Sequence, residues 1–474
     1  MSTILDSIRQ SAQTVMQAVA PPPPPPPRQS PEEIQAKVDA STSDPKQREL
    51  LTRGYTQAQE KGDGALWKQT DDLATLYHDR EVLQLSRSLG ANDAAPDGWH
   101  KASAAELKQY GITSSQLHPQ GSGFNAELFI PDPAVYGKDA QPVLAFEGTD
   151  FGDVQDVNAD VAQAMGNPEE YYERAMSLAT TVSEHSDGNV IYSGHSLGGG
   201  LATAAAQVTG GQGIVSNPAG VHSDTTSRFL SERGLTPPAD ADAGITTYAV
   251  DGDLLTTLQR DTQGLTSRNA DALATDLNLG VAIYNHYTGN SLPTNASGDQ
   301  LRDLPDAAGT VVTLDATNKD GSARPDVIPL EDILADINST ADKLSLPGVA
   351  AEKTGGFFGK LGDIVDGATD WLGDRLADAD KYLPGDVLKN MGGGIKTVGD
   401  VVDNIGEFAR ASGKSIEEVN RDLAVVIAAG KQGLSGDVRD TFGEMIDRHS
   451  FGVLDASLGT EVGSREDALE AELG

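Results

Sequence analysis

The clearest hydrophobic pattern in the chain is a short apolar strand that runs into a glycine-rich turn and then into a helix of small residues. The strand is expected at 189–192, the turn reads Gly-His-Ser-Leu-Gly at 194–198, and the helix is expected at 201–207. Glycines on both sides of the serine let a strand and a helix pass close together. This arrangement is typical of a nucleophile elbow, in which the serine projects from a strained turn.

Apolar stretches on both sides of this turn predict an alternation of strands and helices. Strands are expected at 125–130, 142–146, 213–218 and 245–250, and helices at 156–164 and 171–182. Such alternation is typical of a mostly parallel sheet with right-handed crossovers. The sequence therefore predicts an α/β fold.

Helical spacing dominates the two ends of the chain. Between residues 30 and 89, apolar positions recur three or four apart, and Ser-Pro-Glu-Glu from Ser30 is typical of a helix start. Two further apolar helical faces are expected at 357–376 and 395–408, and a capping box begins at Ser415. These later faces pack on the core, or they form a lid or a lipid-contacting surface.

These patterns divide the chain into five segments. Seven consecutive prolines at 21–27 predict an extended spacer behind the N-terminal head. The predicted segments are a flexible head with its polyproline linker at 1–29, a helical region at 30–119, an α/β core at 120–335, a helical insertion at 336–440, and a final segment with a tail at 441–474.

Composition excludes several functions. The formal net charge is −36, with 71 acidic and 35 basic residues, which argues against binding to nucleic acid. The chain has no cysteine, so thiol chemistry and cysteine-based metal sites are excluded. The acidic stretch at 315–326 lacks the ligand spacing of a calcium-binding EF-hand loop. We therefore expect no metal and no cofactor.

Targeting signals are also informative. Residues 1–20 carry Asp6 and Arg9 where a Sec signal peptide would need an apolar core. No run reaches the roughly 18 apolar residues that a membrane-spanning helix needs. We therefore expect the protein to be made in the bacterial cytoplasm without a Sec signal and to be exported by a dedicated secretion system.

The elbow points to serine chemistry. Ser196 is the candidate nucleophile, and the amide of Leu197 at the helix start is a candidate oxyanion donor. The strand at 142–146 ends before Thr149, whose amide and hydroxyl are candidates for the second donor. Past the strand at 245–250, Asp253 is the preferred acid, because a glycine carries it beyond the strand exit, and Asp251 is the alternative.

The general base is found by elimination among eight histidines. With the chain order serine, acid, histidine, only His286 and His449 follow the acid. His286 lies in a polar, turn-rich stretch, and His449 directly precedes a helix-like apolar pattern. On the residues alone the two are equal candidates. His195, next to the serine, is expected to point elsewhere.

The motifs resemble the class 3 lipases and related bacterial phospholipases A of the α/β-hydrolase superfamily. The matching pieces are the strand and turn at 143–149, the elbow at 194–199, and the Tyr-x-Val-x-x-Asp pattern that ends at Asp253. The resemblance spans roughly residues 120–260. The chain departs from it at Glu147, where the family often has arginine, so the salt bridge of that arginine is not expected here.

This resemblance implies hydrolysis of acyl esters of lipids, with phospholipase A activity favoured over a triglyceride lipase, and it favours His449 as the base. The implied substrate is a membrane phospholipid or another lipid ester. The missing signal peptide, the proline-linked head and a membrane-degrading activity together suggest a secreted bacterial effector toxin, antibacterial or host-directed, with an immunity protein or secretion adaptor as partner. The alternatives are an esterase or acyltransferase acting on soluble esters, or a membrane-binding, pore-forming protein acting through its amphipathic helices.

Overall fold

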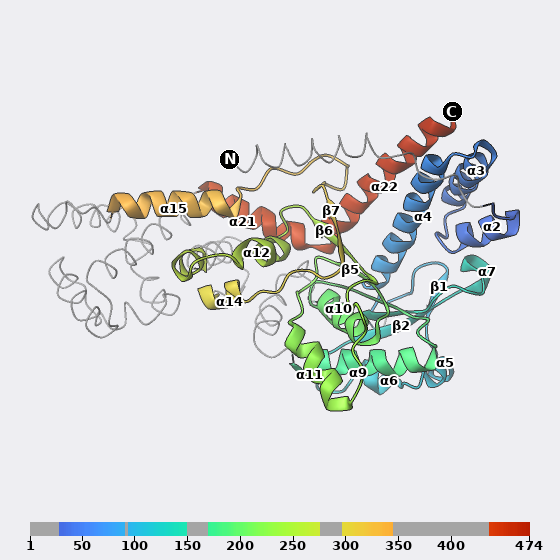
Figure 1. Ribbon diagram of the computed structural model, residues 1–474, viewed down its shortest axis with the longest axis horizontal. Helices are drawn as coiled ribbons and strands as arrows, with labels where there is room; N and C mark the ends of the chain where they lie inside the picture. The colour runs from blue at the N-terminus through green and yellow to red at the C-terminus, as the bar shows by residue number, and fades with distance from the viewer. Residues whose placement is uncertain (1–27, 91–92, 149–168, 275–295, 345–435) are drawn as a thin grey trace, which may run out of the picture.

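The computed structural model describes residues 28–90, 93–148, 169–274, 296–344 and 436–474 (Figure 1). Several predicted features lie outside the described residues. They are the N-terminal head up to residue 27, Thr149, the helix expected at 156–164, His286, and the apolar helical faces between 345 and 435.

A sheet of seven strands forms the centre of the described structure. The strands are β1 (Trp99–Lys101), β2 (Ala126–Pro131), β3 (Val143–Phe146), β4 (Ile191–His195), β5 (Gln212–Ser216), β6 (Ile245–Val250) and β7 (Thr310–Leu314). They lie in the sheet in the order of the chain. Strand β2 is antiparallel to both β1 and β3, and β3 to β7 are parallel. The expected α/β fold with a mostly parallel sheet is confirmed.

Two edge strands were not expected from the sequence. Strand β1 has only three residues, too few for a visible alternation. Strand β7 is largely exposed, and Val311 within it is 45% exposed, so its apolar residues do not follow the pattern of a buried strand. Both strands extend the sheet beyond the strands that the apolar pattern predicted.

The helical N-terminal region and the C-terminal helix together cover one face of the sheet. This layer contains α2 (Pro31–Asp39), α3 (Pro45–Lys61), α4 (Gly64–Leu85) and α22 (Phe451–Leu473). Ser30 caps α2 with a capping box, as the sequence indicated. Helix α4 contacts β4 and β5, and α22 contacts β6 and β7. Figure 1 shows α4 and α22 lying along each other, and one continuous apolar cluster joins them to the sheet.

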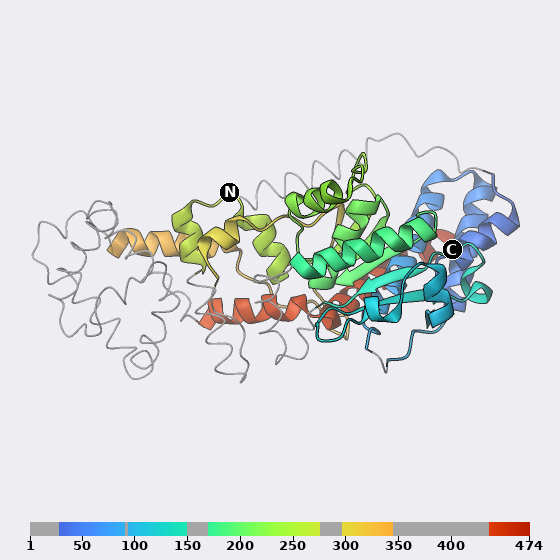
Figure 2. The same cartoon turned by 90° about the horizontal axis from the view of Figure 1, so that it is seen from below.

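The opposite face is covered by helices from the middle of the chain. They are α5 (Ala104–Gln109), α6 (Ser114–Leu117), α9 (Glu169–His185), α10 (Leu197–Thr209) and α11 (Ser223–Arg233), while the short α7 (Pro133–Tyr136) follows β2. Helix α10 is packed between the sheet and α9, which runs along this face in Figure 2. Because α10 is buried almost all round, its residues are mostly glycine and alanine.

A third apolar cluster lies beside the sheet. It joins α12 (Leu254–Thr262), α14 (Gly298–Arg302), α15 (Leu330–Leu344) and α21 (Gly436–His449). Its buried side chains include Leu258, Ile333, Phe442 and Met445. The limits of the predicted insertion, residues 336 and 440, fall inside α15 and α21. Over the ranges that the structure describes, no helix is long and apolar enough to cross a membrane.

Candidate active site

Strand β4 leads into a sharp turn at Ser196. The backbone of Ser196 has φ 55° and ψ −123°, a conformation that a non-glycine residue adopts only under strain of about 1–3 kcal/mol. A Cβ on Gly194 would overlap the backbone of Gly198, and a Cβ on Gly198 would overlap the carbonyl oxygen of Phe146. Strand and helix therefore approach so closely that both positions require glycine.

Three of the predicted site residues meet at this turn. His449 Nε2 lies 2.8 Å from Ser196 Oγ, and His449 Nδ1 lies 2.6 Å from Asp253 Oδ1. The exposed fractions of Ser196, His449 and Asp253 are 3%, 2% and 0%. The structure thus places a hydroxyl, an imidazole and a carboxylate in one hydrogen-bonded line that is shielded from water.

The hydrogen bonds determine the tautomer of His449. A carboxylate only accepts, so His449 Nδ1 donates to Asp253 and leaves the lone pair on Nε2 for the Ser196 hydroxyl. The other carboxylate oxygen accepts from the backbone amide of Thr256 at 2.8 Å, because Asp253 is the N-cap of α12. Both oxygens have partners, and the helix N-terminus favours the negative charge. Such an arrangement suits a general base held by an acid.

Of the other predicted site residues, two are described by the structure and two are not. Asp251 is exposed, and its backbone carbonyl accepts from Arg448 Nη1 at 2.6 Å. Leu197 is the first residue of α10, where an amide has no acceptor within the helix. Thr149 and His286 lie outside the described residues. Glu147, which stands where the related families often have arginine, accepts from Asn125 Nδ2 at 2.6 Å.

His195 lies beside the site, and its ring nitrogens contact groups other than the Ser196 hydroxyl. Its Nε2 donates to the backbone carbonyl of His449 at 2.8 Å, and its Nδ1 accepts from the hydroxyl of Ser216 at 3.1 Å. The two imidazole rings lie 5.2 Å apart. Burial, and then the neighbouring His449, lower the pKa of His195 to about 3, so the ring stays neutral. No local signal predicts this contact, because 254 residues separate the partners.

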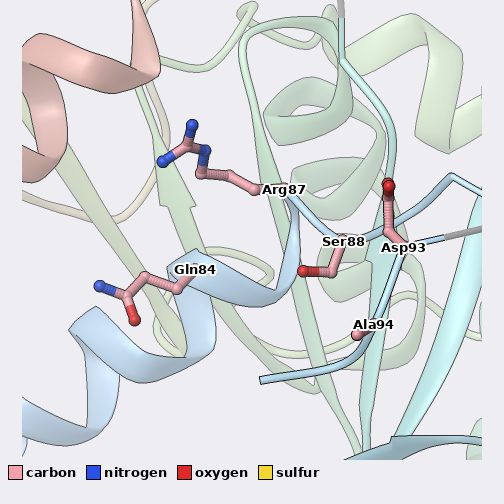
Figure 3. Close-up of a pocket in the computed structure, with 5 residues that line it drawn as sticks. All are labelled: Gln84, Arg87, Ser88, Asp93 and Ala94. Atoms are coloured by element: carbon pink, nitrogen blue, oxygen red, sulfur yellow. The ribbon is translucent and has the colours of Figure 1, made fainter. Parts of the chain in front are cut away.

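A polar pocket lies at the end of α4, near the segment that carries His449. It has a volume of about 520 Å³ and is lined by Gln84, Arg87, Ser88, Asp93 and Ala94 (Figure 3). The Arg87 guanidinium lies 5.1 Å from the centre of the Phe451 ring, and that ring meets the His195 ring edge-on at 5.6 Å.

The described part of the chain contains no cluster of three or more histidine, aspartate or glutamate side chains that could hold a metal ion. The arrangement of groups at Ser196 is suited to nucleophilic attack and proton transfer.

The mostly parallel sheet, with a serine on the strand-to-helix turn at the carboxyl end of β4, is that of an α/β-hydrolase. The profile of the family described as Tle-like phospholipase domain matches residues 74–318, more than half of the chain, and the chain belongs to this family. The matched region includes Ser196 and Asp253 and ends before His449.

A curated relative supports the same family. The extracellular phospholipase A1 of Serratia liquefaciens is 37% identical to this chain over 179 residues. This alignment covers 37% of the chain and 51% of the relative, so the chain spans about half the length of the relative that it matches.

The strain at Ser196 predicts the order of stability of two substitutions. Ser196→Gly and Ser196→Ala both remove the hydroxyl, but only glycine relieves the positive φ. We expect the glycine variant to be more stable than the alanine variant by about 1 kcal/mol, and the preference for glycine over alanine at a helix N-cap acts in the same direction. Chemical denaturation of both variants measures the difference. An alanine variant of equal or greater stability would show that the turn is not strained.

The lowered pKa of His195 predicts a pH-dependent stability. The folded-state pKa of about 3 lies below the unfolded value of about 6.5, so between these pH values the unfolded state binds an extra proton. The contribution of the neutral His195 to the free energy of unfolding is complete above pH 6.5 and is lost as the pH falls toward 3. As the pH is lowered below 6.5, we expect the free energy of unfolding to fall more steeply for the wild type than for His195→Gln. The two slopes should differ by up to about 1.4 kcal/mol per pH unit. Denaturation at pH 7.5, 6.5 and 5.5 measures both slopes, and parallel slopes would contradict a neutral, buried His195.

Proposed function

We propose that the protein is a serine phospholipase that hydrolyses acyl esters of membrane phospholipids. The observation that carries this proposal is the buried line of hydrogen bonds from Asp253 through His449 to Ser196, with lengths of 2.6 and 2.8 Å. Membership of a phospholipase family supports lipid as the substrate. The name of the Serratia relative supports cleavage of an acyl ester, which is A-type activity.

The geometry supports the following reaction. Ser196 Oγ attacks the ester carbonyl while His449 Nε2 takes the hydroxyl proton, and His449 then returns the proton to the departing alcohol. Asp253 holds the tautomer and stabilises the imidazolium that forms. The Leu197 amide at the start of α10, together with Thr149, stabilises the oxyanion. Water then hydrolyses the acyl-enzyme by the same proton transfers in reverse.

We further propose that the protein acts outside the cell that makes it, as a secreted effector. The relative is named extracellular, which supports this proposal. A phospholipase that attacks bacterial membranes endangers its producer, so an immunity protein is the partner expected if the target is another bacterium. A secretion adaptor is the second expected partner.

The pocket at Arg87 supports a phospholipid over a soluble ester. Within the described residues, Arg87 has no ion pair and no side-chain hydrogen bond, although acidic residues outnumber basic ones by 71 to 35. Figure 3 shows Arg87 and Asp93 on separate sides of the pocket. A cation and an anion held apart suit the phosphate and the ammonium group of a zwitterionic headgroup. We propose that this pocket binds the headgroup while the acyl ester lies at Ser196.

The first test is fatty-acid release from phosphatidylethanolamine vesicles. We expect Ser196→Ala, His449→Ala and Asp253→Asn each to lower the rate by about 10⁴-fold or more, because the three groups act as one unit. His286→Ala and Asp251→Asn serve as matched controls and are expected to stay within about twofold of the wild type.

Other outcomes of this assay distinguish the alternatives. Loss of activity in His286→Ala with full activity in His449→Ala would make His286 the base. Vesicle leakage without fatty-acid release, retained by Ser196→Ala, would identify a membrane-damaging protein that acts through its helices. Turnover of p-nitrophenyl esters alone would identify an esterase for soluble substrates.

The second test concerns the headgroup. Arg87→Gln should lower kcat/KM on phosphatidylethanolamine about tenfold, the loss of one charge-assisted hydrogen bond of about 1.5 kcal/mol. The same variant should turn over p-nitrophenyl butyrate within about twofold of the wild-type rate, since that ester has no phosphate. Arg53→Gln removes the same charge from an exposed position on α3 and is the control. Equal losses on both substrates would rule out a headgroup contact.

A further inference from the structure

Helix α21 ends at His449, and its last carbonyl groups need partners from outside the helix. The final carbonyls of an α-helix have no intrahelical donor, and burial without a partner is costly. Two of them accept side-chain donors here. His195 Nε2 donates to the carbonyl of His449 at 2.8 Å, and Asn217 Nδ2 donates to the carbonyl of Arg448 at 3.3 Å.

Both donors belong to the same edge of the sheet as the elbow. His195 is the last residue of β4, and Asn217 directly follows β5. The residue after His195 is Ser196, so one short segment holds the candidate nucleophile and a cap for the helix that carries the candidate base. Two kinds of hydrogen bond therefore act on the position of His449 relative to Ser196: those that the backbone of α21 accepts and those that the imidazole makes.

The two donors are themselves held rigidly. His195 is buried, and the Ser216 hydroxyl donates to its Nδ1, which leaves the proton on Nε2 for the helix. Asn217 is fully buried, and its side-chain oxygen accepts from the amide of Val250 at 2.9 Å. Its backbone amide donates to the carbonyl of Tyr248 at 2.9 Å. Neither side chain can turn away from α21 without losing a second hydrogen bond.

Arg448 adds a third connection to the sheet edge. This residue is 3% exposed, and its guanidinium donates to the carbonyl of Asp251, just past β6, and to the carbonyl of Pro325. Glu444, one turn earlier in α21, accepts from Arg448 Nε at 3.0 Å. Residues at the carboxyl ends of three successive parallel strands, β4, β5 and β6, thus all bind the last turn of α21.

We propose that His195 and Asn217 are positioning residues for the base: by capping the end of α21 they set the distance and direction from His449 Nε2 to Ser196 Oγ. The kinetic part of this inference rests on the proposed function. Neither residue touches the reacting atoms. The inference adds a determinant of activity that lies outside the three residues of the proposed reaction.

The test uses substitutions that remove one donor to α21. His195→Phe keeps an aromatic ring but has neither the donor nor an acceptor for the Ser216 hydroxyl, whereas His195→Gln keeps a donor near the position of Nε2. Asn217→Asp keeps the oxygen that accepts from Val250 and loses the donor to Arg448. Thr247→Val is the control, because it removes another buried hydrogen bond between a side chain and a carbonyl, to Ala308, away from α21.

We expect His195→Phe and Asn217→Asp to lower kcat about 10- to 100-fold on a phospholipid substrate, with KM within about twofold, because the base is displaced and substrate binding is not. His195→Gln should recover activity to within about threefold of the wild type, and Thr247→Val should match the wild type. The double variant should lose less than the product of the two single losses, because both donors hold one helix end.

A second readout separates this inference from the proposed function. In protein labelled with ¹⁵N-histidine, the Nδ1 proton of His449 reports its hydrogen bond to Asp253 whether or not lipid is cleaved. His195→Phe and Asn217→Asp should shift or broaden this signal, and Thr247→Val should leave it in place. An unchanged signal and kcat in both variants, or a His195→Gln variant as impaired as His195→Phe, would overturn the positioning role. A wild type without lipid hydrolysis would overturn the proposed function, and the signal would still decide the positioning.

Discussion

The hydrogen bond between His449 and the fully buried Asp253 is the contact on which the site depends. A carboxylate removed from water is tolerated only when both oxygens have partners, because its desolvation is otherwise too costly. One partner, the Thr256 amide, is local, whereas His449 lies 196 residues further along the chain. Docking of α21 against α12 therefore completes the site and satisfies a buried charge at the same time.

Three helix ends meet at the carboxyl edge of the sheet, and their polarity matches the charges of the proposed reaction. Ser196 and Asp253 stand at the N-termini of α10 and α12, which favour negative charge. His449 stands at the C-terminus of α21, which favours positive charge. An oxyanion near Ser196, a carboxylate at Asp253 and an imidazolium at His449 would each lie at the helix end that stabilises it.

Local pattern was enough to locate the elbow and the strands around it, since glycine spacing and apolar runs are properties of short stretches. The candidate acid followed from its place after β6. The candidate base did not follow from the residues alone, because its contact with Ser196 spans 253 positions and only the fold brings the two together. For the same reason the sequence does not predict the partner of His195: the carbonyl that it binds belongs to a helix at the other end of the chain.

The family match at 74–318 contains Ser196 and Asp253 but neither His449 nor the helices that hold it. In the structure these later helices are not an appendage. Val453, Leu454 and Leu458 of α22 share one apolar cluster with α4 and the sheet, and α21 contacts both α22 and α12. Because the segment that carries the candidate base also covers one face of the sheet, a change that loosens α22 would displace His449. Stability of the core and geometry of the site are coupled through residues 436–474.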